Sequence, residues 1–343
     1  MLAIGQAAPF FVAPTVSSPE FVFDTAGGRY VLMLFLPTDE RLQPALQALA
    51  THQRLFDDVK AAAFVVMREP DRIQGVRDLR GLRWISDRTG AITRHYGPDA
   101  HWLLLDPALR TLATWPIESA DEVFARVAAL PPVEAHAGVP LHAPVLIVPR
   151  VFEPELCEAL IARHQESGGE ATGVMRDAGD RTVAVMDELK RRRDIWIDDP
   201  DLRAGIQARL ERRLYPMIAM GLGFTVTHIE RFLVSCYDAA DGGVFHAHRD
   251  NTTQGTAHRK FACSLNLNDD FEGGDLRLPE FGPQTYRAPP GGAVVFSCGL
   301  MHEATAVRRG RRYAFLPFFF DDAGAQVLAA YQARVAAAET VSA

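Results

Sequence analysis

The chain has 343 residues, of which 48% are hydrophobic and 23% charged, a composition typical of a soluble globular protein with room for two domains. Lysine and arginine total 36 against 43 aspartates and glutamates, so the formal charge is −7 and no general attraction to nucleic acid is expected. The apolar runs are too short for a bilayer, and the first residues lack the pattern of a signal peptide, so we expect a cytoplasmic protein without membrane association.

Residues 1–135 alternate strand and helix patterns. Buried strands are expected at 29–36 and 61–67, a strand pair at 102–105 and 111–115, and helices at 40–56, 70–79 and 120–130. This alternation predicts an α/β domain in which helices cover a sheet. The proline-rich stretch 136–149 then indicates a linker to a second domain, 150–343.

The second domain changes from helices to short strands. Helices are expected at 153–167 and 200–220, and the alanine-rich stretch 324–339 is expected to form a helix that packs on this domain or on a partner. Between them we expect eight strands separated by glycine and proline turns: 231–237, 243–250, 259–267, 274–279, 284–288, 292–298, 302–307 and 312–319. Short strands at this spacing predict a mainly-β double-stranded β-helix, or jelly roll, with flanking helices.

Two histidines and a carboxylate in this domain have the pattern of a metal site. His248 and Asp250 share the second expected strand, and His302 begins the seventh. Side chains two residues apart on a strand point to the same side, so both can face the barrel interior. A two-histidine, one-carboxylate set holds non-haem Fe(II) and leaves coordination positions open. The pattern therefore predicts an oxygen-activating iron enzyme.

Neighbouring residues offer alternatives to this set. His246 would share a face with His248, and we leave open whether it contacts substrate, lies near the metal or is only structural. Arg312 follows His302 by ten residues and can bind a dicarboxylate co-substrate through its planar guanidinium. Adjacent strand residues face opposite ways, so only one of Arg311 and Arg312 can point inward. The basic run 190–193 fits either a solvent-exposed surface or a substrate-contacting patch.

The stretch 145–320 resembles the 2-oxoglutarate- and Fe(II)-dependent oxygenases, and within them the prolyl 4-hydroxylase-like branch. Four segments carry the resemblance: Pro144 to Cys157; Tyr237, Gly243 and Phe245 followed by His248 and Asp250; 265–268 with 271–276; and His302 to Tyr313. The resemblance implies hydroxylation of an unactivated C–H bond, coupled to conversion of 2-oxoglutarate and O2 to succinate and CO2. Ascorbate is a further cofactor candidate on the same grounds.

The resemblance also implies residue roles. Three residues would ligate iron and form the catalytic centre: His248, Asp250 and His302. Arg312 would bind the distal carboxylate of 2-oxoglutarate, and Tyr237 would place its hydroxyl near that co-substrate. Asn266 stands where some relatives carry a tyrosine that contacts the same carboxylate, so its contact is left open. Arg259 is expected to face the substrate entrance.

The first domain resembles a thioredoxin fold of the peroxiredoxin type. The resemblance rests on residues 5–10, on 34–37 and on 103–107. A peroxiredoxin carries its reactive cysteine seven residues after the proline matching Pro37, and this chain has Pro44 there. All four cysteines lie beyond residue 156. Thiol catalysis needs a thiolate, so peroxidase activity is excluded and the domain is expected to serve interaction, substrate presentation or dimer formation.

These observations lead to one main hypothesis and two alternatives. The main hypothesis is a dioxygenase that hydroxylates a protein or peptide side chain such as proline. The first alternative is hydroxylation of a small molecule, such as a free amino acid or a natural-product intermediate. The second is a non-catalytic scaffold or iron- and oxygen-sensing protein. A homodimer is compatible with all three, and neither nucleic acid nor membrane is expected as a partner.

Overall fold

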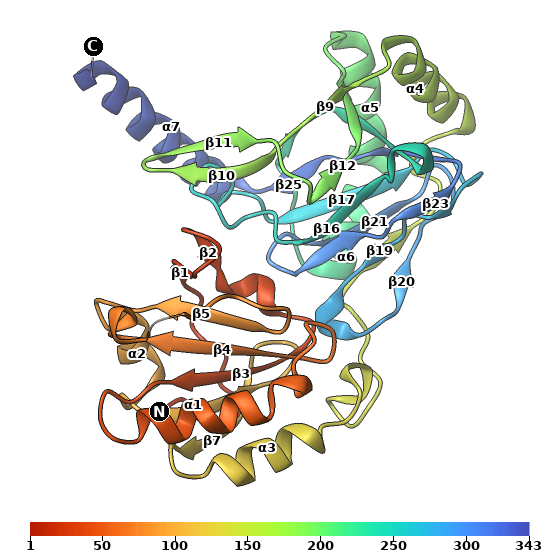
Figure 1. Cartoon of the computed structure of the whole chain (residues 1–343). Helices are drawn as coiled ribbons and strands as arrows, with labels where there is room; N and C mark the ends of the chain where they lie inside the picture. Colours follow the sequence, from red (N-terminus) through yellow and green to blue (C-terminus); the bar gives the residue numbers. More distant parts are fainter. Residues whose placement is uncertain (74, 343) are drawn as a thin grey trace. The chain divides into compact units, whose positions relative to one another are not determined.

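The structure, a computed structural model, describes residues 1–73 and 75–342. These residues form two compact units (Figure 1). The N-terminal unit consists of Met1–His142 together with Pro279–Pro283, and the C-terminal unit consists of Ala143–Leu278 and the chain from Gln284 onward. The division between His142 and Ala143 falls within the stretch 136–149 that the sequence indicates as a linker.

A five-stranded sheet forms the centre of the N-terminal unit. Its order is β5-β4-β3-β6-β7, with β3, β4 and β5 parallel and the other two antiparallel to their neighbours. The strands are β3 (Tyr30–Phe35), β4 (Ala61–Met67), β5 (Leu82–Ser86), β6 (His101–Leu105) and β7 (Thr111–Pro116). Every residue of β3 and β4 is buried, as expected for strands covered on both faces. The prediction of an α/β unit is confirmed.

Short helices and a small hairpin complete this unit. The α-helices are α1 (Leu42–Thr51), α2 (Ala91–Tyr96) and α3 (Ala120–Ala128), and the hairpin pairs β1 (Val12–Ala13) with β2 (Phe21–Val22). Four 3-10 turns are η1 (Phe23–Ala26), η2 (Gln53–Leu55), η3 (Pro70–Arg72) and η4 (Val133–Ala135). Pro44 lies in the first turn of α1, where proline is tolerated because the first backbone N–H groups have no partner within the helix.

The sequence prediction is wrong at one element of this unit. The helix expected at 70–79 is only the single turn η3, because Gly75 takes a positive φ of 72° that a helix cannot contain. The edge strand β5 and the helix α2 follow it, and neither was predicted.

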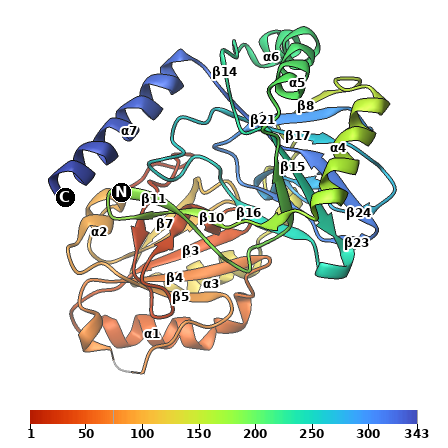
Figure 2. The ribbon, with the colours of Figure 1, turned by 90° about the horizontal axis from the view of Figure 1, so that it is seen from above.

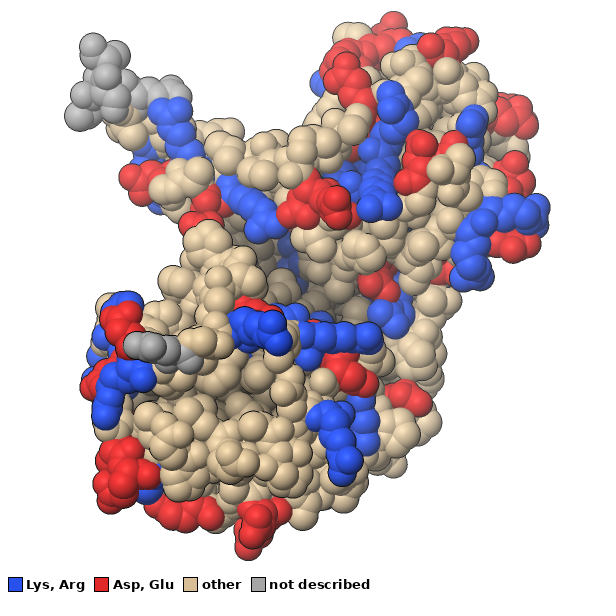
Figure 3. Space-filling model, in the orientation of Figure 1, with Lys and Arg blue, Asp and Glu red and all other residues tan. Residues whose placement is uncertain are grey.

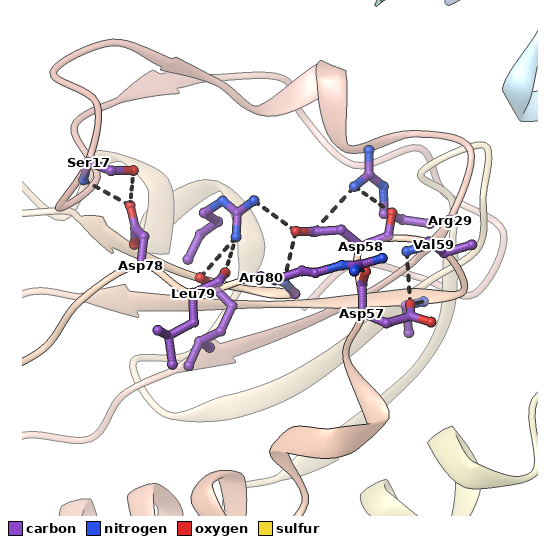
Figure 4. A network of polar contacts seen from close by, with 12 residues as sticks. Ser17, Arg29, Asp57, Asp58, Val59, Asp78, Leu79 and Arg80 are labelled. Carbon is purple, nitrogen blue, oxygen red and sulfur yellow. Dashed lines mark hydrogen bonds and ion pairs between the residues drawn. The ribbon is translucent and has the colours of Figure 1, made fainter.

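Carboxylates hold the loops of the N-terminal unit in place (Figure 4). Asp58 accepts hydrogen bonds from Arg29 at 3.3 Å and from Arg83 at 2.8 Å, which joins the turn before β4 to β5. Asp78 accepts from the backbone N–H and the hydroxyl of Ser17, at 2.9 and 2.5 Å. These polar groups are used within the unit, so they serve its architecture.

The C-terminal unit is built from two sheets. The eight predicted strands divide between them in the alternating order of a jelly roll, which confirms the predicted double-stranded β-helix. The first, third, sixth and eighth lie in the larger sheet: β15 (Leu233–Asp238), β17 (Phe261–Asn266), β21 (Ala293–Ser297) and β24 (Arg311–Phe315). The others lie in the smaller sheet: β16 (Val244–His248), β19 (Leu276–Arg277), β20 (Thr285–Tyr286) and β22 (His302–Ala304).

Further strands extend these sheets. The larger sheet also contains β8 (Leu146–Val148), β9 (Glu170–Ala171), β13 (Arg193–Trp196), β14 (His228–Glu230) and β25 (Phe318–Phe320), and the smaller sheet gains β12 (Lys190–Arg191). Two hairpins pair β10 (Val174–Ala178) with β11 (Arg181–Val185) and β18 (Glu272–Gly273) with β23 (Val307–Arg309). Single 3-10 turns are η5 (Ala239–Asp241) and, in the segment grouped with the N-terminal unit, η6 (Pro279–Phe281).

Helices cover the larger sheet on one face, as Figure 2 shows. They are α4 (Pro154–Ser167), α5 (Pro200–Arg213) and α6 (Tyr215–Leu222). Their buried residues, such as Leu160, Ile206 and Ile218, join an apolar core with Phe315 of β24. All four cysteines are buried and form no disulfide. The predicted helix 200–220 is divided at Leu214, just before Pro216.

The last helix, α7 (Asp322–Ser342), follows β25 directly. Tyr331 of α7 accepts a hydrogen bond from the backbone N–H of Thr182 at 2.7 Å, which connects α7 to the β10–β11 hairpin. Among the residues 1–73 and 75–342, no helix is both long and apolar enough to cross a membrane. Acidic and basic side chains are interspersed over each unit on the face drawn in Figure 3.

Candidate metal and co-substrate site

The two sheets bring His248, Asp250 and His302 together. His248 and His302 are cross-strand partners on β16 and β22. The carboxylate of Asp250 lies 3.6 Å from Nε2 of His248 and 3.2 Å from Nε2 of His302. One ligand atom from each of the three lies within 4.8 Å of the other two. Two ligands at a right angle around a metal with bonds of about 2.1 Å are about 3 Å apart, so this set fits a small metal ion.

Asp250 reaches this position from outside the strand. The sequence predicted a strand through residue 250, but β16 ends at His248 and Asp250 lies in the bend beyond it. Its backbone N–H donates to the carbonyl of Cys298 at 3.0 Å, and its carbonyl accepts from Arg259 at 3.3 Å. Hydrogen bonds to residues distant in sequence therefore place Asp250 beside the histidines, where the sequence had suggested that strand alternation would place it.

Backbone carbonyls select the tautomer of both histidines. Nδ1 of His248 lies 2.7 Å from the carbonyl of His246, and Nδ1 of His302 lies 3.0 Å from the carbonyl of Leu300. A carbonyl only accepts, so Nδ1 carries the proton and Nε2 of the neutral ring presents its lone pair towards Asp250. Hydrogen bonding of the second ring nitrogen is the usual means of orienting a metal-binding histidine.

Local electrostatics favours the metal-binding form of Asp250 and of His248. Burial would raise the pKa of Asp250, but His302 and His248 outweigh it and hold the pKa well below its usual value. Burial lowers the pKa of His248, and His302 lowers it further. An ionised carboxylate and a neutral imidazole are the forms that bind metal.

Aromatic rings fix the orientation of both imidazoles. Phe245 stacks on His248 with ring centroids 3.6 Å apart and planes 19° apart. Phe296 packs edge-on against His302 with centroids 4.6 Å apart. These contacts hold both rings with Nε2 close to the carboxylate of Asp250.

Arg312 lies inside the barrel on β24, opposite Tyr237 of β15. Its guanidinium is buried, donates to Oδ1 of Asn266 at 3.1 Å and to the hydroxyl of Ser264 at 2.5 Å, and lies 5.3 Å from the Tyr237 ring centroid. Arg311 is exposed and pairs with Asp238 at 2.6 Å. Arg312 is therefore the inward-facing member of the arginine pair.

Asn266 contacts Arg312 through an orientation that its own neighbours set. Its Nδ2 donates to the carbonyl of Ala288 at 2.9 Å, which leaves Oδ1 to accept from the arginine. Ser264, two residues earlier on β17, also accepts a hydrogen bond from Arg312, and it was not predicted from the sequence. Its signal is the strand period, because residues 264 and 266 lie on one side of the strand.

The basic run 190–193 alternates between the interior and the surface. Lys190 and Arg192 are buried, and Arg191 and Arg193 are exposed. Nε of Arg192 lies 2.9 Å from Asp194. A wholly solvent-exposed run is therefore wrong, because strand pairing turns every second residue inward.

Arg192 connects this run to Tyr237, which was expected to lie near the co-substrate. Its Nη1 donates to the hydroxyl of Tyr237 at 3.0 Å, and its guanidinium carbon lies 5.6 Å from the centroid of the Phe245 ring that stacks on His248. Arg192 thus contacts Tyr237 and lies near Phe245 in the candidate site.

One further prediction, for Arg259, is corrected, and the structure shows the position of His246, which the sequence left open. Arg259 does not face an entrance: it is buried and forms a bidentate pair with Glu230, with N–O distances of 2.8 and 2.6 Å, while it supports Asp250. His246 has an exposed side chain and lies outside the three-residue ligand set; only its carbonyl contributes, by holding His248.

Comparison with known proteins agrees with this geometry. A family model described as the 2OG-Fe(II) oxygenase superfamily matches residues 232–320. A PKHD-type hydroxylase of Shewanella sp. (strain MR-7) is 30% identical over 182 residues, covering 49% of this chain and 74% of that protein. Another, from Synechococcus sp. (strain CC9605), is 31% identical over 90 residues, covering 26% of this chain and 40% of that protein. The chain thus spans about two fifths of the second relative's length.

Among solved structures, a prolyl hydroxylase from Trichoplax adhaerens in complex with a hypoxia-inducible-factor peptide fragment is 18% identical, with a TM-score of 0.42. That match covers 52% of this chain and 84% of the other. The family match spans strands β15 to β25 and includes all three members of the ligand set. The chain belongs, through its C-terminal unit, to the 2OG-Fe(II) oxygenase superfamily.

Proposed function

We propose that the chain is a 2-oxoglutarate- and Fe(II)-dependent dioxygenase that hydroxylates an unactivated C–H bond. One molecule each of substrate, 2-oxoglutarate and O2 would give the hydroxylated product, succinate and CO2. The observation that carries the proposal is the ligand set His248, Asp250 and His302 beside the buried Arg312. A site with three protein ligands leaves positions for a chelating co-substrate and for O2.

The ligand set would hold Fe(II), which supplies the activation of O2 when it is bound. Both imidazoles are already in the required tautomer, and Asp250 is held by backbone hydrogen bonds. These contacts orient the ligands, so little reorganisation is needed on binding.

Arg312 would bind the distal carboxylate of 2-oxoglutarate. Burial lowers the pKa of Arg312, and a carboxylate partner would offset that cost. Its neighbours Asn266 and Ser264 are neutral acceptors, so the chain supplies no counter-charge at hydrogen-bond distance from its own described residues. The Tyr237 ring beside the guanidinium would limit the access of water.

A proline in a protein or peptide is the substrate that we propose for this site. Support comes from the resemblance to the prolyl 4-hydroxylase-like branch and from relatives described as PKHD-type hydroxylases. We further propose that the N-terminal unit presents substrate or mediates assembly, because it contains no cysteine for redox chemistry.

Turnover of labelled 2-oxoglutarate tests the proposal. Purified protein with Fe(II), ascorbate and carboxyl-labelled 2-oxoglutarate is expected to release CO2, and His248→Ala is expected to abolish the release. Mass spectrometry on peptide and metabolite panels identifies the product by the gain of one oxygen atom. Metal binding without CO2 release from any panel would instead support a non-catalytic, sensing role.

A further inference from the structure

Arg231 is a cation that the proposed reaction does not yet use. It lies between β14 and β15 with a positive φ of 69°, which residues other than glycine rarely adopt. Its Nε is fully buried and has no hydrogen-bond partner. Within residues 1–73 and 75–342, its guanidinium contacts the ring of Phe318, 4.1 Å from the centroid, and makes no hydrogen bond or ion pair. An aromatic ring satisfies none of the in-plane N–H donors.

The side chain lies among the charged groups of the candidate site. Its pKa is lowered to about 10, first by burial and then by the charge of Arg259, while Glu230 and Asp250 act in the opposite direction. Arg192 lowers it further. Arg259 contacts the same Phe318 ring, also at 4.1 Å. Arg231 and Arg259 thus contact one aromatic ring, and Arg259 also donates to the carbonyl of Asp250.

Among the described residues, the cations around the site differ in whether a carboxylate of the chain pairs with them. Two arginines have carboxylate partners in the chain: Arg192 with Asp194, and Arg259 with Glu230. Arg312 is the residue to which we assign the carboxylate of 2-oxoglutarate. Arg231 remains: the residue is partly buried, its Nε is fully buried, and buried charged groups in proteins are almost always paired because desolvation is costly. The missing partner is expected to be an anion that binds from outside.

We propose that Arg231 binds a carboxylate of the substrate that is hydroxylated, which rests on the proposed function of the site. A guanidinium with free N–H donors recognises a carboxylate by two parallel hydrogen bonds. The substrate class is therefore a carboxylate-bearing molecule whose target C–H bond is close to that carboxylate. A free amino acid, the C-terminus of a peptide and an acidic residue beside the target share this chemistry.

Calorimetric binding of matched probes tests this assignment without turnover. The full chain is loaded with Mn(II) and saturated with N-oxalylglycine, so that the 2-oxoglutarate position is occupied. The probes are L-proline against L-prolinamide, a prolyl peptide with a free against an amidated C-terminus, and a capped peptide with Pro-Glu against Pro-Gln. In at least one pair the probe with the carboxylate is expected to bind about 10- to 100-fold more tightly than its amide counterpart, as for a hydrogen bond between charged groups. The pair that responds identifies the source of the carboxylate.

Two substitutions separate recognition from folding. In Arg231→Gln the preference for the carboxylate is expected to fall below about threefold, and in Arg231→Lys part of it is expected to remain. Arg231→Gln removes an unpaired, partly buried charge, so its Tm is expected to be unchanged or higher. The matched variant Arg259→Gln removes a paired arginine and is expected to lower Tm.

Three results would overturn the proposal. In the first, no pair of probes shows a preference for the carboxylate; in the second, Arg231→Gln keeps that preference in full. In the third, Arg231→Gln lowers Tm as Arg259→Gln does, and Arg231→Lys binds the carboxylate probe no more tightly than Arg231→Gln. The two proposals can fail separately. Carboxylate binding through Arg231 without CO2 release from 2-oxoglutarate contradicts the proposed function alone. CO2 release without an Arg231-dependent preference contradicts only the assignment of Arg231.

Discussion

His248 and His302 are cross-strand partners, and the same hydrogen bond orients both rings. In each, Nδ1 donates to the carbonyl of the residue two positions earlier. The repeated contact gives both histidines one tautomer and leaves both Nε2 atoms on the side of Asp250. The orientation of both histidines is thus set by carbonyls close to them in sequence, whereas Asp250 is held by contacts with Cys298 and Arg259.

The ligand set predicts which substitutions abolish metal binding. His302→Ala and Asp250→Ala are each expected to lower the metal content of the purified, Fe(II)-loaded chain from about one ion to nearly none, because two remaining ligands bind far more weakly. His246→Ala is the matched control and is expected to bind metal normally, since only its backbone carbonyl is used. Metal content by mass spectrometry decides the outcome, and full metal content in Asp250→Ala would contradict the assignment.

Arg312 and Arg311 provide a test of co-substrate recognition. Arg312→Gln is expected to raise the KM for 2-oxoglutarate by about 10- to 100-fold, since a charged bidentate contact is lost. Arg311→Gln is expected to change it less than about twofold, because that side chain is exposed and pairs with Asp238. Steady-state kinetics at varied 2-oxoglutarate provides the comparison. Equal effects in the two variants would show that the wrong arginine was chosen.

Arg192 is expected to matter for stability as well as for the site. Arg192→Gln leaves Asp194 buried without its strongest partner and is expected to lower the free energy of unfolding by about 3–5 kcal/mol. Arg191→Gln, on the exposed side of the same strand pair, is expected to change it by less than about 0.5 kcal/mol. Urea unfolding followed by circular dichroism measures both, and a neutral Arg192→Gln would mean that the buried pair contributes little.

The same pair predicts how stability depends on pH. Burial would raise the pKa of Asp194, but Arg192 and Lys190 outweigh it and lower the pKa to about 2, from the usual 3.8. The folded state then binds fewer protons than the unfolded chain, so this stabilisation is complete above about pH 5 and is lost as the pH falls from about 4 towards 2. Thermal unfolding of wild type and Asp194→Asn between pH 3 and 7 is the measurement. A smaller acid-induced loss of Tm in the variant is expected, and equal losses would contradict the assignment.

The local pattern of the chain predicted much of the architecture. Strand signals between glycine and proline turns placed all eight jelly-roll strands, because turn residues and β-branched or apolar runs are local properties. Local patterns failed at 70–79, where Gly75 interrupts a helical periodicity that propensity alone would continue. The spacing of His248, Asp250 and His302 also pointed to one cavity, although the expected reason, strand alternation through residue 250, is wrong because β16 ends at His248.

Contacts between distant strands could not be predicted from the sequence. Nothing near Arg259 indicates that Glu230 will hold it, and nothing near Asp250 indicates that the carbonyl of Cys298 will replace the strand pairing. The burial of Arg192 beside Tyr237 likewise depends on contacts between distant segments. So does the absence of a hydrogen-bond partner for Nε of Arg231. By itself the sequence determined the strand pattern, the ligand types and the choice of family. Only the tertiary structure decided which charges are paired, because pairing depends on the side-chain distances that sheet closure creates.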